Sequence, residues 1–145
     1  MKVKDCMCHD VKFVTPNTSV CDCAKLMSDN NIGCVPVCDE NNKVVGLITD
    51  RDVILRTVAC NKDSASTKVS DIMTCNVCTC NADANIEEAE KLMSKNAIRR
   101  IPVIENNKII GILTLGDLAQ NEQINSQNVC NVLESICDCN TKNNK

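Results

Sequence analysis

The chain has 145 residues, enough for one domain or a pair of small ones. Hydrophobic residues make up 43% of it and charged residues 24%, which is typical of a globular protein and unlike a disordered chain. The net charge is -3. Because binding to phosphate backbones needs clustered cations and the chain has no long run of Lys or Arg, nucleic acid is not an expected partner.

No apolar run approaches the roughly 20 residues that span a bilayer, and the N-terminus lacks the apolar stretch of a signal peptide. We therefore expect a cytoplasmic protein with no membrane partner. The chain contains 13 cysteines, an odd number that cannot pair completely within one chain. Reduced thiols are the simpler interpretation. Phe13 is the only aromatic residue, so aliphatic residues, Met and Cys must build the core.

An internal repeat is the most informative feature of the sequence. The matching segments are KLMS at 25–28 and 91–94, VPV at 35–37 with IPV at 101–103, and GLITDRD at 46–52 with GILTLGD at 111–117. They occur in the same order with nearly the same spacing. The order predicts a first repeat over residues 1–59, a linker over 60–69 and a second repeat over 70–121.

Each copy is predicted to contain a short strand, a helix, two strands and a second helix. In the first copy, residues 11–14 are β-prone, and Thr18 or Ser19 can cap a helix over the residues that follow. Residues 33–38 and 44–48 form a predicted hairpin around a polar turn. Thr49 or Asp50 can cap the second helix. Its predicted inward face consists of Val53, Ile54, Thr57 and Val58.

The second copy follows the same pattern, and a different segment comes after it. Asp83 or Asn85 can cap the first helix of this copy, and residues 109–113 form its last strand. Residues 122–145 are predicted to form a short amphipathic helix and a tail, which docks on the module or on a second subunit. The apolar positions of this helix are Val129, Val132, Leu133, Ile136 and Cys137. Two units of about 50 residues should pack face to face to bury enough surface, with a pseudo-twofold relation and two equivalent clefts.

These motifs resemble the CBS-domain pair, also called a Bateman module. The resemblance rests on a leading Asp-x-Met (residues 71–73, weaker at 5–7), the -x-Pro-Val- strand and the Gly-h-h-Thr-x-x-Asp segment, each present twice. It implies an α+β fold of two tandem β-α-β-β-α repeats, in a stand-alone bacterial-type protein. It also implies that the chain binds adenosine nucleotides and forms a homodimer.

The chemistry of the proposed site follows from the residue types. Thr49 and Thr114 carry hydroxyls that can bond to a phosphate or ribose oxygen. The carboxylates of Asp52 and Asp117 can accept hydrogen bonds from the two ribose hydroxyls. The nearest cations for a phosphate are Arg51, Arg99 and Arg100. Gly46 and Gly111 are expected where the backbone approaches the ligand closely.

The resemblance also places an adenine slot between the first strand of each repeat and the residues before its Pro. Its members in the first repeat are Val11, Lys12, Phe13, Cys34 and Val35, and in the second repeat Val77, Cys78, Thr79, Arg100 and Ile101. A simpler interpretation stays open for the motif residues themselves. Each Thr and Asp pair can form a helix capping box and nothing more.

Cysteine pairs leave a second hypothesis open. Cys75-x-x-Cys78-x-Cys80 is the best candidate for a metal or redox site, although buried cysteines that act as small hydrophobes are the favoured interpretation. No nucleophile and base pattern is present, so an enzyme is not expected. The favoured function is a regulatory module that binds AMP, ADP, ATP or a related adenosyl ligand, needs no other cofactor, and reports the energy state to an unknown protein target. A dimerisation module without a ligand is the remaining alternative.

Overall fold

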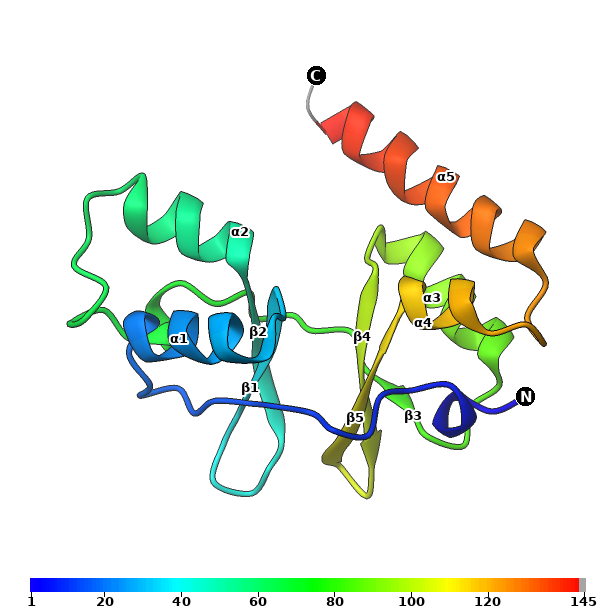
Figure 1. Ribbon diagram of the computed structural model, residues 1–145, viewed down its shortest axis with the longest axis horizontal. Coiled ribbons are helices and arrows are strands. Elements are labelled where there is room, and N and C mark those ends of the chain that lie inside the picture. Colours follow the sequence, from blue (N-terminus) through cyan, green and yellow to red (C-terminus); the bar gives the residue numbers. More distant parts are fainter. Residues whose placement is uncertain (144–145) are drawn as a thin grey trace. The chain divides into compact units, whose positions relative to one another are not determined.

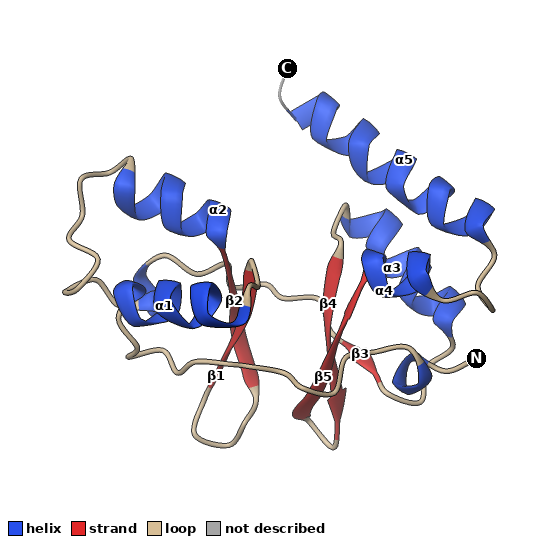
Figure 2. Ribbon diagram, in the orientation of Figure 1, coloured by secondary structure: helices blue, strands red, loops and turns tan. Residues whose placement is uncertain are grey.

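The computed structural model describes the backbone of residues 1–143 and the side chains of residues 1–138. The chain divides into two compact units, whose elements are labelled in Figure 1 and coloured by type in Figure 2. The first unit is Lys12–Val77. The second unit combines Met1–Val11 with the residues from Cys78 onward. The two compact units therefore do not coincide with the two sequence repeats, because residues 1–11 of the first repeat fold with the second unit.

The first unit begins with helix α1 (Val20–Asn30). Ser19 caps this helix, since its Oγ accepts a hydrogen bond of 3.0 Å from the backbone N–H of Asp22. Asn31 ends the helix in the left-handed conformation, with φ of 52°. Its inward face is apolar, since Val20, Cys23 and Met27 are buried.

Strands β1 (Cys34–Cys38) and β2 (Val44–Thr49) form the predicted hairpin. Residues 11–14 do not form the strand that the sequence predicts. Only Val14 pairs with β1, in an isolated parallel bridge to Val37, because the chain passes from the second unit to the first just before it. The core of this unit lies between α1, the hairpin and a 3-10 turn over Val69–Asp71.

The helix after β2 differs from the prediction. Helix α2 (Asp50–Val53) changes after one turn into a π-helical turn over Ile54–Val58. Thr57 is 1% exposed, whereas Ile54 and Val58 are 57% and 66% exposed, so the predicted inward position of these two residues is wrong. The predicted inward face requires an α-helix with 3.6 residues per turn. A π-helical turn bonds each residue to the fifth before it and so rotates the following side chains about the axis.

The second unit contains a three-stranded sheet in the order β3 (Cys80–Asn81), β4 (Arg100–Glu105) and β5 (Lys108–Thr114). β3 runs parallel to β4, and β4 and β5 form an antiparallel hairpin. Helix α3 (Ile86–Asn96) follows β3, and helix α4 (Leu115–Gln120) follows β5. The N-cap of α3 is Asn85, without a side-chain hydrogen bond.

Helix α5 (Ser126–Asn143) is 18 residues long and packs on α3 and α4 of its own unit. Val129, Val132 and Ile136 are buried in the core of the second unit, as the amphipathic pattern predicts. Leu133 is 41% exposed, and Cys137 is exposed. No helix in the described part of the chain is both long enough and apolar enough to cross a membrane.

The two Asp-x-Met segments exchange partners between the repeats. Met7 belongs to the first copy but packs in the core of the second unit, and Met73 of the second copy packs against the core of the first unit. A Cβ atom on Gly111 would lie 2.6 Å from the Met7 Sδ, and one on Gly46 would collide with the Met73 Sδ. Each glycine therefore makes room for a methionine side chain, and a close approach of a ligand to these positions stays a prediction.

Candidate functional site

The two Thr-x-x-Asp motifs form matching capping boxes. The Thr49 Oγ1 accepts from the Asp52 backbone N–H at 3.1 Å, and the Asp52 Oδ2 accepts from the Thr49 N–H at 3.0 Å. Thr114 and Asp117 make the same two bonds at 3.0 and 2.9 Å. Both motifs therefore form the capping box that the sequence allows. In each capping box the threonine hydroxyl can still donate its proton, and the second carboxylate oxygen of the aspartate can still accept a hydrogen bond.

The surroundings of the second carboxylate oxygen differ between Asp52 and Asp117. The Asp52 Oδ1 lies 3.6 Å from the guanidinium of Arg56, which also donates a 2.8 Å hydrogen bond to the carbonyl of Ile72. Asp52 is therefore partly neutralised, and its side chain is only 13% exposed. Asp117 has no ion-pair partner among the described residues. The carboxylate of the second unit is the one with an acceptor left for a ligand.

A pocket of about 480 Å³ lies beside the second motif. Its volume is within the usual range of about 300–1,000 Å³ for small-molecule sites. It is built at the end of the β4–β5 hairpin, where Arg100 lies opposite Thr114, and it extends over α4 to α5. The residues that line it are Arg99, Arg100, Thr114, Leu115, Gly116, Ala119, Val129 and Leu133.

The pocket joins cationic and apolar walls. Neither Arg99 nor Arg100 has an ion-pair partner among residues 1–138, so both positive charges are available to an anion. The aliphatic side chains that line the pocket include Leu115, Val129 and Leu133. Such a site suits a ligand with an anionic group at one end and an apolar ring at the other.

The structure brings together only part of the predicted site. Arg99, Arg100 and Thr114 line the pocket, and Asp117 is joined to Thr114 through the capping box. Val35 and Ile101 are fully buried in the two cores, so their side chains pack within the protein. Phe13 is 39% exposed in the first unit. Val11 and Thr79 fall in the second unit and Val77 in the first.

The Thr49 motif lies at the same place in its hairpin as the Thr114 motif does. Cys34 lies opposite Thr49 at the end of the β1–β2 hairpin, as Arg100 lies opposite Thr114. Arg51 is exposed. Five residues that line the pocket were not predicted as site residues, namely Leu115, Gly116 and Ala119 on α4 and Val129 and Leu133 on α5. The apolar periodicity of residues 129–137 predicts the two α5 residues only as part of a docking face.

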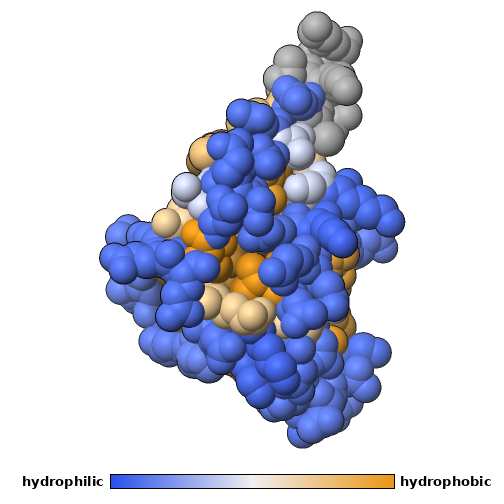
Figure 3. All heavy atoms as spheres, turned by 90° about the vertical axis from the view of Figure 1, so that its right-hand side faces the viewer, coloured by the Kyte–Doolittle hydropathy of each residue, from blue (hydrophilic) through white to orange (hydrophobic). Residues whose placement is uncertain are grey.

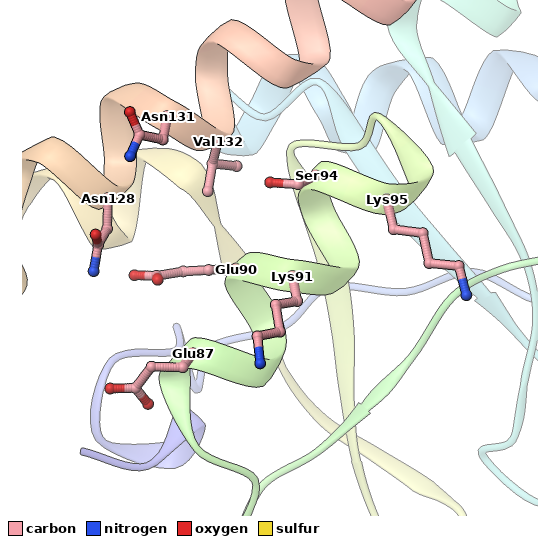
Figure 4. Close-up of a pocket in the computed structure, with 8 residues that line it drawn as sticks. All are labelled: Glu87, Glu90, Lys91, Ser94, Lys95, Asn128, Asn131 and Val132. Carbon is pink, nitrogen blue, oxygen red and sulfur yellow. The ribbon is translucent and has the colours of Figure 1, made fainter.

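A second groove, of about 600 Å³, lies between α3 and α5. Figure 4 shows Glu90 pointing from α3 toward α5, near Asn128. Glu90 is 8% exposed, and its carboxylate has no hydrogen-bond or ion-pair partner among the described residues. Burial raises its pKa above the ordinary value, and the charge of Glu87 acts in the same direction.

The cysteines are mostly separate from one another. Cys23, Cys34, Cys38 and Cys80 are buried, and burial raises the pKa of Cys23, Cys38 and Cys80 to about 11. A thiol with such a pKa is a poor nucleophile and a poor metal ligand at neutral pH. Within the described residues, no three Cys, His, Asp or Glu side chains come together in a way that could hold a metal ion.

The comparisons with known proteins decide the family. A family model described as CBS domain matches residues 3–58 and, again, residues 69–122. The chain belongs to the CBS domain family. It carries two CBS domains, which together form a regulatory module. It is 42% identical over 127 residues to the protein YlbB of Bacillus subtilis (strain 168), a match that covers 87% of this chain and 85% of that protein.

Two solved structures are similar to this CBS pair. The CBS domain pair of protein MJ0100, solved with 5'-methylthioadenosine and S-adenosyl-L-methionine, is 32% identical with a TM-score of 0.74, covering 83% of this chain and 94% of that one. Hypoxic Response Protein I, solved with two coordinated zinc ions, is 26% identical with a TM-score of 0.77, covering 83% of this chain and 98% of that one.

Proposed function

We propose that the second unit binds an adenosine nucleotide, namely AMP, ADP, ATP or a related adenosyl compound, and that the chain is a regulatory module which reports the level of this ligand to a protein target. One observation carries the proposal. The pocket beside the Thr114 motif combines two unpaired arginines with an aliphatic wall, next to a carboxylate that has a free oxygen.

Each part of a nucleotide has a partner of matching chemistry there. The guanidinium groups of Arg99 and Arg100 can pair with phosphate through charge-assisted hydrogen bonds. The free oxygen of Asp117 can accept from a ribose hydroxyl, and Thr114 can donate to a ribose or phosphate oxygen. The aliphatic wall can cover a purine face. A similar CBS pair was solved with two adenosyl compounds, which supports this class of ligand.

The first unit offers the same motif with a weaker set of partners. Arg51 is its candidate cation, while the second oxygen of Asp52 already faces Arg56. We therefore propose that ligand binding at the Thr49 motif is weaker than at the Thr114 motif.

Isothermal titration with AMP, ADP and ATP tests the proposal. Asp117→Asn is the informative variant, because an amide oxygen can still cap the helix while the negative charge is lost. It should weaken binding at least about tenfold, the usual effect of losing one charged hydrogen bond. Asp52→Asn is the matched control and should change the affinity of the tighter site by less than about twofold. No heat with any adenosyl compound would refute the proposal.

A dimerisation module without a ligand is the competing function. It predicts a thermal midpoint that does not change with nucleotide, whereas a ligand of the native state must raise it. We also propose that the chain forms a homodimer, as the family resemblance implies. The exposed side chains of Ile54, Leu55 and Val58 support this, and sedimentation equilibrium of the wild type measures it. A monomer at all concentrations would contradict it.

A further inference from the structure

The C-terminal helix supplies one wall of the pocket. Val129 and Leu133 are one helical turn apart on α5, and both line the cavity that contains Arg99 and Arg100. We infer that α5 is part of the nucleotide site, with Leu133 as a residue that contacts the ligand, and that ligand binding is coupled to the docking of α5. This inference rests on the proposed function.

The exposure of α5 side chains supports a contact with the ligand. Val129, Val132 and Ile136 are 9%, 4% and 1% exposed and anchor the helix to the core. Leu133 lies in the same apolar set but is 41% exposed, although it lines a cavity. Figure 3 shows one face of the molecule, which is mostly hydrophilic with a small group of hydrophobic side chains near its centre. A ligand in the pocket would cover the apolar surface of Leu133.

The other side of α5 faces a groove. The groove between α3 and α5 contains the unpaired carboxylate of Glu90 and the amides of Asn128 and Asn131 (Figure 4). Among the residues whose side chains are described, no hydrogen bond or ion pair joins α3 to α5, so apolar contacts hold the two helices together. Helix α5 therefore has a groove on one side and the proposed ligand pocket on the other. By linkage, a ligand that contacts α5 stabilises its docking, and docking of α5 raises the affinity for the ligand.

Titration of the full chain with AMP and ATP tests the inference on three variants. Leu133→Ala should weaken the tighter site about threefold to tenfold, the effect of losing part of one buried aliphatic contact. Leu133→Met keeps most of the side-chain volume and should bind as the wild type does. Glu134→Ala is the control, since Glu134 is exposed on the same helix and does not line the pocket. Circular dichroism confirms that each variant is folded.

Hydrogen exchange of the wild type gives a second readout. Saturating AMP should slow the exchange of the α5 amides between residues 129 and 137, because the bound state holds the helix in place. Leu133→Ala should reduce this protection.

The outcomes separate the inference from the proposed function. If the wild type binds an adenosyl ligand and Asp117→Asn weakens binding, but Leu133→Ala has no effect and α5 exchange is unchanged, only the inference is overturned. A tighter Leu133→Ala variant would show that α5 obstructs the pocket, which also overturns it. A wild type that binds no adenosyl ligand overturns both.

Discussion

Replacing Gly111 by alanine tests whether the Asp-x-Met segment of the first repeat packs on β5 of the second unit. A Cβ at this position would lie 2.6 Å from the Met7 Sδ and 2.7 Å from the carbonyl oxygen of Cys8. Ordinary contacts are about 3.5–4.0 Å. The sulfur can rotate away, but the carbonyl cannot, since it accepts from the Ile112 N–H at 3.1 Å while the Cys8 N–H donates to the Ile112 carbonyl at 2.9 Å.

The cost follows from these contacts. Moving the Cys8 backbone weakens two hydrogen bonds, each worth about 0.5–1.5 kcal/mol, and overpacking adds about 1–3 kcal/mol. Alanine also lowers the conformational entropy of the unfolded chain, which stabilises the folded protein by about 0.4–1 kcal/mol. We expect Gly111→Ala to lower the free energy of unfolding by about 2–4 kcal/mol and the thermal midpoint by about 5–15 °C.

Gly46→Ala is the matched comparison in the first unit. The three atoms nearest to a Cβ there all belong to the flexible side chain of Met73, so we expect a loss of about 1 kcal/mol. Urea denaturation followed by circular dichroism at 222 nm suits a chain without Trp or Tyr. Equal stability of Gly111→Ala and the wild type would refute the proposed packing of residues 7 and 8 on β5.

Three further predictions concern buried polar groups. The Thr57 hydroxyl is buried without a hydrogen-bond partner, so Thr57→Val should raise the free energy of unfolding in urea by about 1 kcal/mol; a loss of stability would mean that the hydroxyl is bonded. Burial raises the pKa of Glu90, so the folded chain keeps a proton that the unfolded chain releases, and stability should fall as pH rises from the unfolded to the folded pKa. Glu90→Gln should remove this decrease, and an unchanged profile in urea melts between about pH 4 and about pH 8 would contradict the assignment. Burial raises the pKa of Cys38 to about 11, so iodoacetamide at about pH 8 should label exposed Cys75 well before Cys38, as read by mass spectrometry; equal rates would contradict the burial.

Features encoded by short segments were predictable from the sequence. The repeat, both hairpins and the caps at Ser19, Thr49 and Thr114 depend on residues within a few positions of one another. Family membership followed from the order of these segments. The apolar period of α5 was predictable for the same reason.

Features that depend on distant contacts were not predictable. The same Asp-x-Met motif occurs in both copies, so the sequence cannot say on which hairpin Met7 packs. The π-helical turn after Val53 changes which side chains are buried, and no residue type marks it. The pocket wall at Leu133 needs the position of α5 beside α4, which only the fold provides.

Crystallographic difference density for AMP in the full chain tests the central claim most directly. We predict a phosphate against Arg99 and Arg100 and a ribose within hydrogen-bond distance of the Asp117 carboxylate. Density for the nucleotide elsewhere, or a pocket closed by the side chains of Leu115 and Leu133, would contradict the proposed site.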